Sequence, residues 1–373
     1  MTDLPPEQND REEGLCNLAK SVAMRRYNKP VISFERVKLQ GSVSFTLDVA
    51  MKDHPNVIVQ FREEPLDITP FKTARMLLGN AVPSIEVFDN VAEFCVLMSK
   101  IPGETWFNIE VDWEEEQSFI KAAIGLGKLM SLCFVPRDNE SIKKHIIPKL
   151  QGILTMEIRS GINVTRYFPL VRDLISVSNR LGDLPSFFSH PDLNPMNILA
   201  DNAGNITGIV DWELSRVLPF GISSWAIHFL AGQFLTLENK EIGFVERPFY
   251  ERIERAFWEA LLQNAPKEVY DQLQSQMDLL QLSVIVGTVV QVLGTHEEKG
   301  ETNLSDIHVP SLNALPKLLR YRIPFIRGAT GKPFDAPEYQ IQRHAQPSPE
   351  RNQRIARLKE KATLAIEMGS ENT

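Results

Sequence analysis

The chain has 373 residues, of which 43% are hydrophobic and 24% are charged, so it can bury a large core and is expected to divide into two lobes. Its formal net charge of −8 disfavours DNA or RNA as a partner, because phosphate backbones attract basic surfaces. Three widely spaced cysteines, Cys16, Cys95 and Cys133, form no CxxC pair. They argue against a disulfide framework or a zinc site and favour a reducing compartment.

Neither the start of the chain nor its most apolar stretch indicates export or a membrane anchor. Residues 1–14 are polar and acidic, unlike a secretory signal or an Arg-rich mitochondrial leader. Residues 279–293 are the most apolar window, but they are fewer than the ~20 residues of a membrane span, and Gln281 and Gln291 interrupt them. We expect a buried helix there, no membrane partner and a cytoplasmic protein.

Strands dominate the first hundred residues. Alternating apolar positions, β-branched residues and turn residues predict the elements in this part of the chain. They are two strands within 31–51 that meet near Gly41 and Ser42, a third strand at 56–61, a helix at 70–79 that ends at Gly79, and a strand at 94–103 that runs into a Pro-Gly turn. Residues 1–100 are therefore predicted to form a β-rich nucleotide-binding lobe.

From residue 112 onward the apolar period becomes helical. Helices are predicted at 114–134 and 248–263, with a strand-like stretch at 196–211 between them. The expected fold is α+β and bilobal, with a larger helical lobe over 101–326 that builds the catalytic and acceptor sites. Residues 327–373 are predicted to be an extension whose last helix begins at Ser348 and Pro349.

The most informative stretch is SHPDLNPMNILADNAGNITGIVDW, residues 189–212. Its second half predicts a hairpin with the loop DNAGN, which brings Asn197 and Asp211 to the same end. Together with Asp192, these residues supply a carboxylate for an acceptor hydroxyl and oxygen ligands for Mg²⁺ beside nucleotide phosphates. Asp, Asn and Pro are ordinary loop residues, but an Asn five residues after Asp192 and an Asp fourteen after that Asn, beside apolar strands, favour phosphoryl transfer.

The segment SHPDLNPMNILAD…GNITGIVDWE resembles the catalytic segment of the aminoglycoside phosphotransferase and choline kinase superfamily, distant relatives of protein kinases, and in particular its fungal phosphotransferase branch. The resemblance covers roughly residues 30–325, and its specific part is 190–213. It implies a protein-kinase-like fold that uses ATP with Mg²⁺. Asp192 would be the catalytic base, and Asn197 and Asp211 the metal ligands. His190 would support the catalytic loop.

The same resemblance places Glu213 just beyond the metal-binding Asp and makes residues 98–101 the hinge that receives adenine through backbone groups. The candidate hinge residues are Met98, Ser99 and Lys100. The segment 218–232 also resembles fungal members, although Trp225 and His228 are expected to line a core helix.

The nucleotide side departs from the family pattern. The loop LQGSVSF has one glycine, so Gly41 and Ser42 are weak candidates for phosphate contacts. Gln60 stands where a kinase lysine is expected, and Arg62, on the same strand face, could reach the phosphates or be a solvated edge charge. The helix at 70–79 contains no acid, and Pro70 stands where its glutamate is expected.

The leading hypothesis is an ATP- and Mg²⁺-dependent kinase that phosphorylates a hydroxyl of a small molecule. The acidic net charge would tolerate a cationic or neutral acceptor. One alternative is a nucleotide-binding regulator or assembly factor with impaired transfer, and another is an enzyme that uses ATP to activate a carboxylate. A protein substrate is disfavoured, because no APE-like element follows VDWE.

Overall fold

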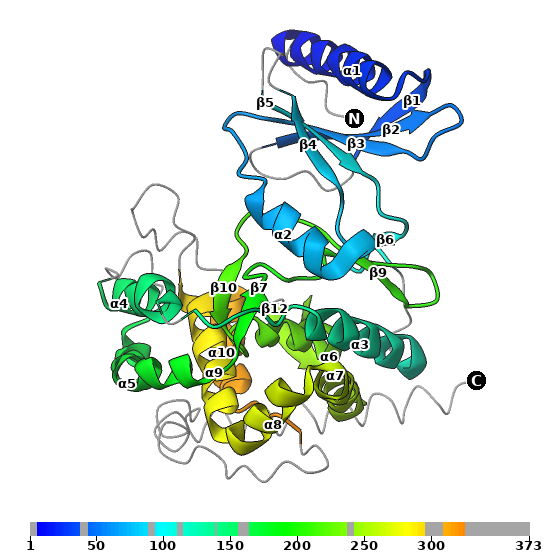
Figure 1. The fold of residues 1–373 in the computed structure, drawn as a ribbon. Coiled ribbons are helices and arrows are strands. Elements are labelled where there is room, and N and C mark those ends of the chain that lie inside the picture. The colour runs from blue at the N-terminus through cyan, green and yellow to red at the C-terminus, as the bar shows by residue number, and fades with distance from the viewer. Residues whose placement is uncertain are drawn as a thin grey trace, which may run out of the picture.

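The chain folds into a β-rich N-terminal part and a helical C-terminal part, which confirms the predicted α+β, bilobal class (Figure 1). The computed structural model describes residues 6–37, 44–88, 94–109, 115–138, 140–155, 164–236, 242–294 and 309–324. The α-helices are α1 (Pro6–Tyr27), α2 (Thr69–Leu78), α3 (Glu116–Ser131), α4 (Ile147–Leu154), α5 (Phe168–Ser178), α6 (His228–Ala231), α7 (Tyr250–Asn264), α8 (Lys267–Ser275), α9 (Met277–Leu293) and α10 (Val309–Leu318).

The strands are β1 (Val31–Arg36), β2 (Ser44–Met51), β3 (Val57–Arg62), β4 (Ile85–Phe88), β5 (Phe94–Ser99), β6 (Glu104–Thr105), β7 (Ser186–Ser189), β8 (Ile198–Ala200), β9 (Ile206–Ile209), β10 (Arg216–Pro219), β11 (Gly232–Thr236) and β12 (Ile242–Glu246). The short 3₁₀ or π turns are η1 (Gly79–Ala81), η2 (Ile142–Ile146), η3 (Thr165–Tyr167), η4 (Asn179–Asp183) and η5 (Ser224–Ile227).

The N-terminal sheet is antiparallel, with the strand order β1-β2-β3-β5-β4. In β3 the side chains alternate strictly, so Val57, Val59 and Phe61 are buried while Gln60 and Arg62 are half-buried on the opposite face. The predicted strands within 31–51, at 56–61 and at 94–103 are confirmed. The turn at Gly41 and Ser42 lies outside the described residues.

Helix α1 covers the outer face of this sheet, and sequence reasoning missed it (Figure 1). Its apolar residues Leu15, Ala19, Val22 and Ala23 recur at helical spacing and pack into one buried cluster with the sheet residues that face away from the cleft described below. The signal was present in the sequence, but it stood beside an acidic stretch that gave the segment a polar overall composition. The sheet is therefore a two-layer unit with α1 on one face.

Helix α2 joins the sheet to the helical part. The predicted end at Gly79 is confirmed, because Gly79 has a φ of +60° and its N–H donates to the carbonyl of Arg75. On the other side, Phe71, Ala74 and Leu78 are buried in the core of the C-terminal part. This helix therefore packs with the C-terminal core, although it follows β3 in the chain.

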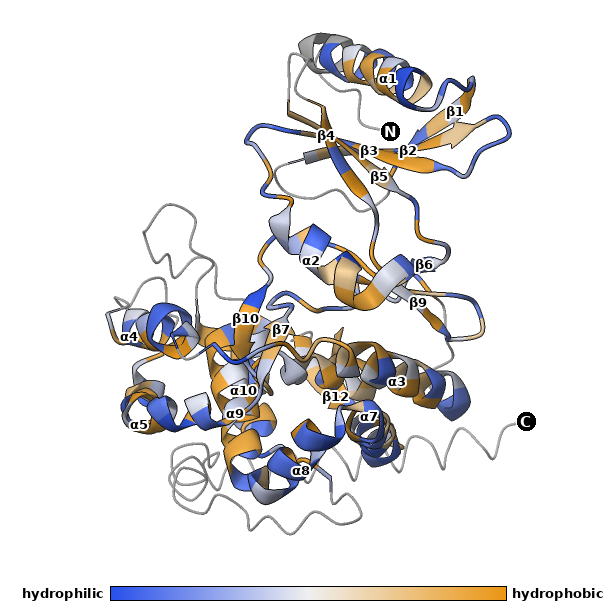
Figure 2. Ribbon diagram, in the orientation of Figure 1, coloured by the Kyte–Doolittle hydropathy of each residue, from blue (hydrophilic) through white to orange (hydrophobic). Residues whose placement is uncertain are grey.

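The C-terminal part is built around the packing of α3 on α7 and around the buried helix α9. A Cβ at Gly127 of α3 would lie 2.5 Å from the Phe257 carbonyl oxygen of α7, so the two backbones approach at a distance that only glycine allows. Helix α9 is apolar along nearly its whole length in Figure 2, and most of its residues are buried, which confirms the buried helix predicted at 279–293. The predicted helices at 114–134 and 248–263 are confirmed as α3 and α7.

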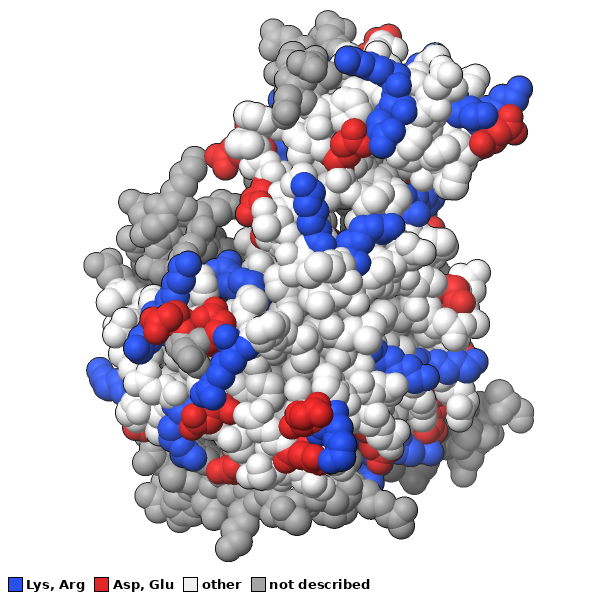
Figure 3. All heavy atoms as spheres, in the orientation of Figure 1, with Lys and Arg blue, Asp and Glu red and all other residues white. Residues whose placement is uncertain are grey.

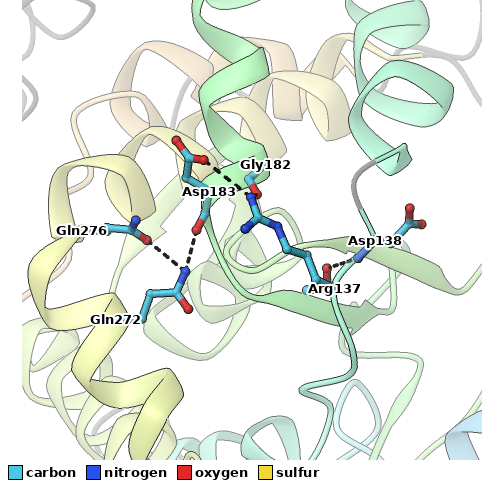
Figure 4. Close-up of polar contacts among 7 residues, drawn as sticks. Arg137, Asp138, Gly182, Asp183, Gln272 and Gln276 are labelled. Carbon is cyan, nitrogen blue, oxygen red and sulfur yellow. Dashed lines mark hydrogen bonds and ion pairs between the residues drawn. The ribbon is translucent and has the colours of Figure 1, made fainter.

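Strand β7, which leads into residues 190–213, is held in place at its beginning. Figure 4 shows Arg137 extending toward the Gly182 carbonyl and the Asp183 carboxylate, which lies 3.5 Å from the guanidinium. Gln272 of α8 donates to the Asp183 carbonyl at 2.6 Å. Ser186, the first residue of β7, accepts a hydrogen bond from the Asp138 N–H at 2.8 Å. These contacts fix where β7 begins, four residues before His190.

The described residues include all three cysteines, and their surface carries both signs of charge (Figure 3). The three cysteines are unpaired, and burial raises the pKa of the Cys95 and Cys133 thiols to about 12. On the face shown in Figure 3, basic and acidic side chains are interspersed.

Among the described helices, none alone is long and apolar enough to cross a membrane; only the pair α8 and α9, bent by 89°, meets that test together. The segment 327–373, with Ser348 and Pro349, lies outside the described residues, and the boundaries at 100 and 326 stay predictions.

Candidate active site

A cleft of about 900 Å³ lies between the N-terminal sheet and the segment that follows β7. Nearly all the described residues that the sequence singles out line it. These are Gln60, Arg62, Met98, Lys100, Asp192, Asn197, Asp211 and Glu213. The fold therefore gathers around one cleft side chains from β3, from the end of β5 and from the chain on both sides of the β8–β9 hairpin, which are far apart in the sequence.

The predicted hairpin is confirmed as β8 and β9, and it places Asn197 beside the end of β9. Ile198 pairs with Ile209, and the Val210 N–H donates to the Asn197 carbonyl at 2.9 Å. In the loop, the Asp201 carboxylate accepts hydrogen bonds from three groups, the N–H groups of Ala203 and Asn205 and the Asn205 amide. The loop thus closes on its own side chains, as DNAGN predicts.

Asp192 is held by two asparagines. The Asn194 side-chain amide donates to Asp192 Oδ1 at 3.0 Å. The Asn197 amide donates to Asp192 Oδ2 at 3.1 Å and to its backbone carbonyl at 2.8 Å. Both carboxylate oxygens are therefore oriented, and Asn197, predicted only as a metal ligand, also positions Asp192.

His190 is a positioning residue that does not line the cleft. Its side chain is buried, with Nε2 2.9 Å from the Val210 carbonyl and its ring edge-to-face with Trp212 at 4.8 Å. Burial lowers the pKa of His190, so the ring is neutral and Nε2–H donates to that carbonyl. This hydrogen bond ties the chain before Asp192 to the chain before Asp211. The supporting role of His190 stays a prediction.

Asp211 combines backbone strain with an altered acidity. Its φ of +63° lies in the left-handed region, which is uncommon for a residue other than glycine and is typical of functional sites. Its surface opens into the cleft, but the surrounding protein restricts solvation. That desolvation raises the pKa of Asp211 to about 6, with further contributions from Glu213 and Asp192, while Arg62 opposes the shift.

The carboxylates at this end of the cleft fit a magnesium ion. Among the described residues, no group of three or more His, Cys, Asp or Glu could hold a metal ion by itself. Mg²⁺ usually takes only one or two carboxylates from the protein and completes its shell with water and substrate phosphates. Asp211 and the Asn197 amide oxygen would be the hard oxygen ligands, and a cation would offset both the desolvation and the repulsion that raise the pKa of Asp211.

Arg62 contacts this acidic group from the opposite lobe. Its Nη2 lies 2.8 Å from Glu213 Oε2, and its side chain is only 13% exposed. Its Nε atom is buried without a hydrogen-bond partner. Gln60, two residues earlier on the same face, donates instead to the Ser44 and Thr46 hydroxyls. The pairing of Arg62 with Glu213 was not foreseen, because no local sequence pattern links β3 to the chain after β9.

The family pattern has a glutamate in this helix, and the structure agrees with the sequence that this chain lacks it. Helix α2 has no acidic residue, and Pro70 lies in its first turn. Glu63 and Glu64, which precede the helix, are exposed. The cation that faces the cleft from β3 is therefore held by Glu213, which follows β9, and not by an acid from α2.

The hinge candidates divide between two faces. Met98 and Lys100 line the cleft, and Lys100 forms an ion pair with Asp48. Ser99 is not among the lining residues; its Oγ accepts a hydrogen bond from the Ser84 N–H at 2.8 Å. Gly41 and Ser42, the loop candidates, lie outside the described residues. Met98 and Lys100 thus stay nucleotide-binding candidates by position.

Sequence reasoning missed the far end of the cleft. Residues from several helices and from β10 line it, namely His145, Lys149, Arg216, Leu218, Ile222, Trp225 and Val290. Trp225 and His228 are buried, as expected for core residues, but Trp225 also reaches the cleft wall. The stretch IKKHIIPKL did not indicate a cleft wall, because basic residues on a helix usually form a solvated face.

The chain was also compared with known proteins. No protein-family model and no curated protein matches it. Among solved structures it is similar to a Plasmodium vivax ethanolamine kinase, with 14% identity and a TM-score of 0.49 over 77% of this chain and 82% of that one. It is also similar to a spectinomycin phosphotransferase solved with ADP and spectinomycin, with 13% identity and a TM-score of 0.46 over 78% of this chain and 92% of that one.

A choline/ethanolamine kinase family protein from Mesorhizobium loti is similar as well, with 14% identity and a TM-score of 0.48 over 89% of this chain and 99% of that one. All three are small-molecule kinases or phosphotransferases by name. At these identities and TM-scores function does not transfer, so the function proposed next depends on the geometry of this chain's own residues. The fungal branch stays a prediction.

Proposed function

We propose that the protein is an ATP- and Mg²⁺-dependent phosphotransferase that acts on a hydroxyl group of a small molecule. The observation that carries this proposal is the orientation of Asp192 by Asn194 and Asn197 in the same cleft as Asp211. A carboxylate with both oxygens held can orient an acceptor hydroxyl and take its proton. The side-chain oxygens of Asn197 and Asp211, in the same cleft, suit a Mg²⁺ ion that is also bound to the phosphates of a nucleotide.

Each residue then has a defined role. Asp192 accepts the proton of the acceptor hydroxyl as that oxygen bonds to the γ-phosphorus and the bond between this phosphorus and the ADP oxygen breaks. Asn197 and Asp211 would hold Mg²⁺, which neutralises charge on the phosphates when it is bound. His190 keeps the two chain segments in register, and Arg62 faces the cleft as the cation from the sheet.

Production of ADP tests the proposal directly. The full chain is incubated with Mg-ATP and pools of hydroxylated small molecules, and ADP release is compared with that of Asp192→Asn. We expect at least one pool to raise ADP release in the wild type but not in the variant. The same ADP release from both proteins would remove Asp192 from the reaction and overturn the proposed mechanism.

A second candidate is a nucleotide-binding regulator without transfer activity. It is favoured by Gln60 at the position expected for a lysine and by the absence of an acid in α2. Two observations weigh against it, because Asp192 is oriented through both oxygens and Arg62 still brings a cation to the cleft. Mg²⁺-dependent ATP binding without acceptor-dependent ADP release would favour the regulator. An enzyme that transfers AMP to a carboxylate would be recognised by AMP as its product.

A further inference from the structure

The far end of the cleft has a composition unlike that of the catalytic end. Its walls combine three basic side chains, His145, Lys149 and Arg216, with apolar residues such as Ile222 and Trp225. All five lie in the C-terminal part and line the same cleft as Asp192. A molecule that presents a hydroxyl to Asp192 would extend its other end into this region.

Two of the basic residues, His145 and Lys149, lie in a helical stretch that has a local irregularity. The turn η2 is a π-helix that leads directly into α4, and single π turns in helices are frequent at functional sites. His145 and Lys149 are half-buried and line the cleft, whereas Lys143 and Lys144 of the same turn are exposed and do not. Two of the basic groups in this stretch are therefore turned toward the cavity and two toward solvent.

The guanidinium of Arg216 is held in a fixed position. Its Nη1 lies 3.2 Å from His145 Nδ1, and its Nε donates to the Leu214 carbonyl at 3.1 Å. Burial lowers the pKa of His145, and Arg216 lowers it further, so the ring is neutral and accepts the hydrogen bond. In the strand pair β7 and β10, Arg216 lies opposite Ser189, next to His190. The guanidinium is thus fixed to the strands that carry the catalytic segment.

The charges of the cleft are divided by position. Of the acidic lining residues, Asp192, Asp211 and Glu213 belong to the catalytic segment, and the others lie in the N-terminal sheet or in β6. No acid among the described lining residues comes from η2, α4, β10, η5 or α9, which form the far end. A cationic acceptor group placed there would meet like charges, whereas an anionic one would meet Arg216 and Lys149.

We infer that the acceptor carries an anionic group, a carboxylate or a phosphate, on an apolar body, and that Arg216 and Lys149 bind this group while its hydroxyl faces Asp192. This inference rests on the proposed phosphotransferase function and names its acceptor class. It differs from the expectation drawn from the net charge of the whole chain, because the local charge at the far end has the opposite sign. His145 acts as a positioning residue for the Arg216 guanidinium.

A matched set of ligands tests the inference. Four benzyl alcohols differ only in the para substituent: 4-(hydroxymethyl)benzoate, 4-(hydroxymethyl)phenyl phosphate, the neutral 4-(hydroxymethyl)benzamide and the cationic 4-(aminomethyl)benzyl alcohol. Their binding to the full chain is measured by calorimetry with and without Mg-ADP. We expect one anionic member to bind at least tenfold more tightly than the neutral and cationic members, and the better of the two distinguishes carboxylate from phosphate. Equal binding, absence of anion binding, or preference for the ammonium compound would overturn the inference.

Substitutions at Arg216 and Lys149 test whether these residues cause the preference for an anionic ligand. Arg216→Gln and Lys149→Gln should each weaken binding of the preferred anion at least tenfold and leave affinity for Mg-ATP unchanged. Lys144→Gln, an exposed lysine in the same turn, is the matched control and should change neither. Loss of Mg-ATP affinity in Arg216→Gln would assign this arginine to the nucleotide instead. Because nucleotide binding by the wild type is measured separately, failure of the proposed function and failure of the acceptor assignment give different results.

Discussion

The two walls of the cleft meet the demands of phosphoryl transfer to different degrees. The C-terminal wall presents Asp192 with both oxygens oriented and Asp211 beside it. The sheet wall has Gln60 at the position expected for a lysine and no helix acid behind it. Arg62 enters the cleft two residues further along β3 and pairs with Glu213 of the C-terminal wall.

The difference between the two walls shows which parts of such a site can tolerate substitution. The base and the metal ligands must meet the reacting atoms, so their geometry is narrowly constrained. A cation that neutralises phosphate charge acts over a longer range and can come from a neighbouring residue on the same strand face. In this chain Arg62 is held by Glu213, so one ion pair joins the two walls. Under the proposed function, this pair would take the place of a clamp within the N-terminal lobe.

Asp192→Asn should have the largest effect. Asparagine keeps the size of the side chain but cannot accept the acceptor proton, so turnover should fall by about 10²–10⁴-fold. Affinity for Mg-ATP should stay within about threefold of the wild type, measured by calorimetry, because Asp192 acts on the acceptor. Turnover close to that of the wild type would show that the intact C-terminal wall does not perform the reaction.

Asp211→Asn should change nucleotide binding instead of proton transfer. Asparagine adopts a positive φ readily, so the backbone at this position should be kept. The loss of a charged ligand should remove most of the increase in ATP affinity that Mg²⁺ produces, on the order of tenfold or more. The measurement is ATP affinity with and without Mg²⁺, in both proteins. A variant that keeps the full metal dependence would contradict the assignment of Asp211.

Arg62→Met tests the sheet wall. Without the guanidinium, Glu213 loses its partner and the phosphates lose the cation that faces them, so ATP affinity should fall roughly tenfold, the size of a hydrogen bond to a charged group. Gln60→Met on the same face is the uncharged comparison: Gln60 donates to Ser44 and Thr46 and accepts a 3.4 Å hydrogen bond from Arg62, so its loss should lower ATP affinity less than loss of the guanidinium. An equal loss of ATP affinity in both variants would show that the affinity depends on the structure of β3 and not on the charge of Arg62.

Glu254→Gln should leave the cleft unchanged and alter only stability. Burial raises the pKa of Glu254 to about 8 in the folded state, above its ordinary value of 4.5, so the unfolded chain releases the proton first as the pH rises. The contribution of Glu254 to the free energy of unfolding should therefore be fully present below about pH 4.5 and fall as the pH rises to about 8, by up to about 1.4 kcal/mol per pH unit. The free energy of unfolding, measured with urea at several pH values, should depend less on pH in Glu254→Gln than in the wild type. An identical dependence on pH would refute the buried, protonated glutamate.

The parts of this site that follow from sequence are local. Asn197 and Asp211 lie at one end of a short hairpin, so their spacing predicted that they meet. The pair Arg62–Glu213 could not be predicted, because it joins two lobes through tertiary packing alone. The basic far end was missed for the same reason: a helical pattern shows that His145 and Lys149 share a face, but only the fold shows that this face lines a cleft.

Calorimetric titration of the full chain with ATP, with and without Mg²⁺, tests the central claim most directly. The paired walls of the cleft predict saturable micromolar binding that depends on Mg²⁺, because Asn197 and Asp211 would hold the ion against the phosphates and Arg62 would face them. Absence of binding under both conditions would contradict the claim. It would mean that Arg62 does not replace the missing clamp and that this cleft serves a different ligand.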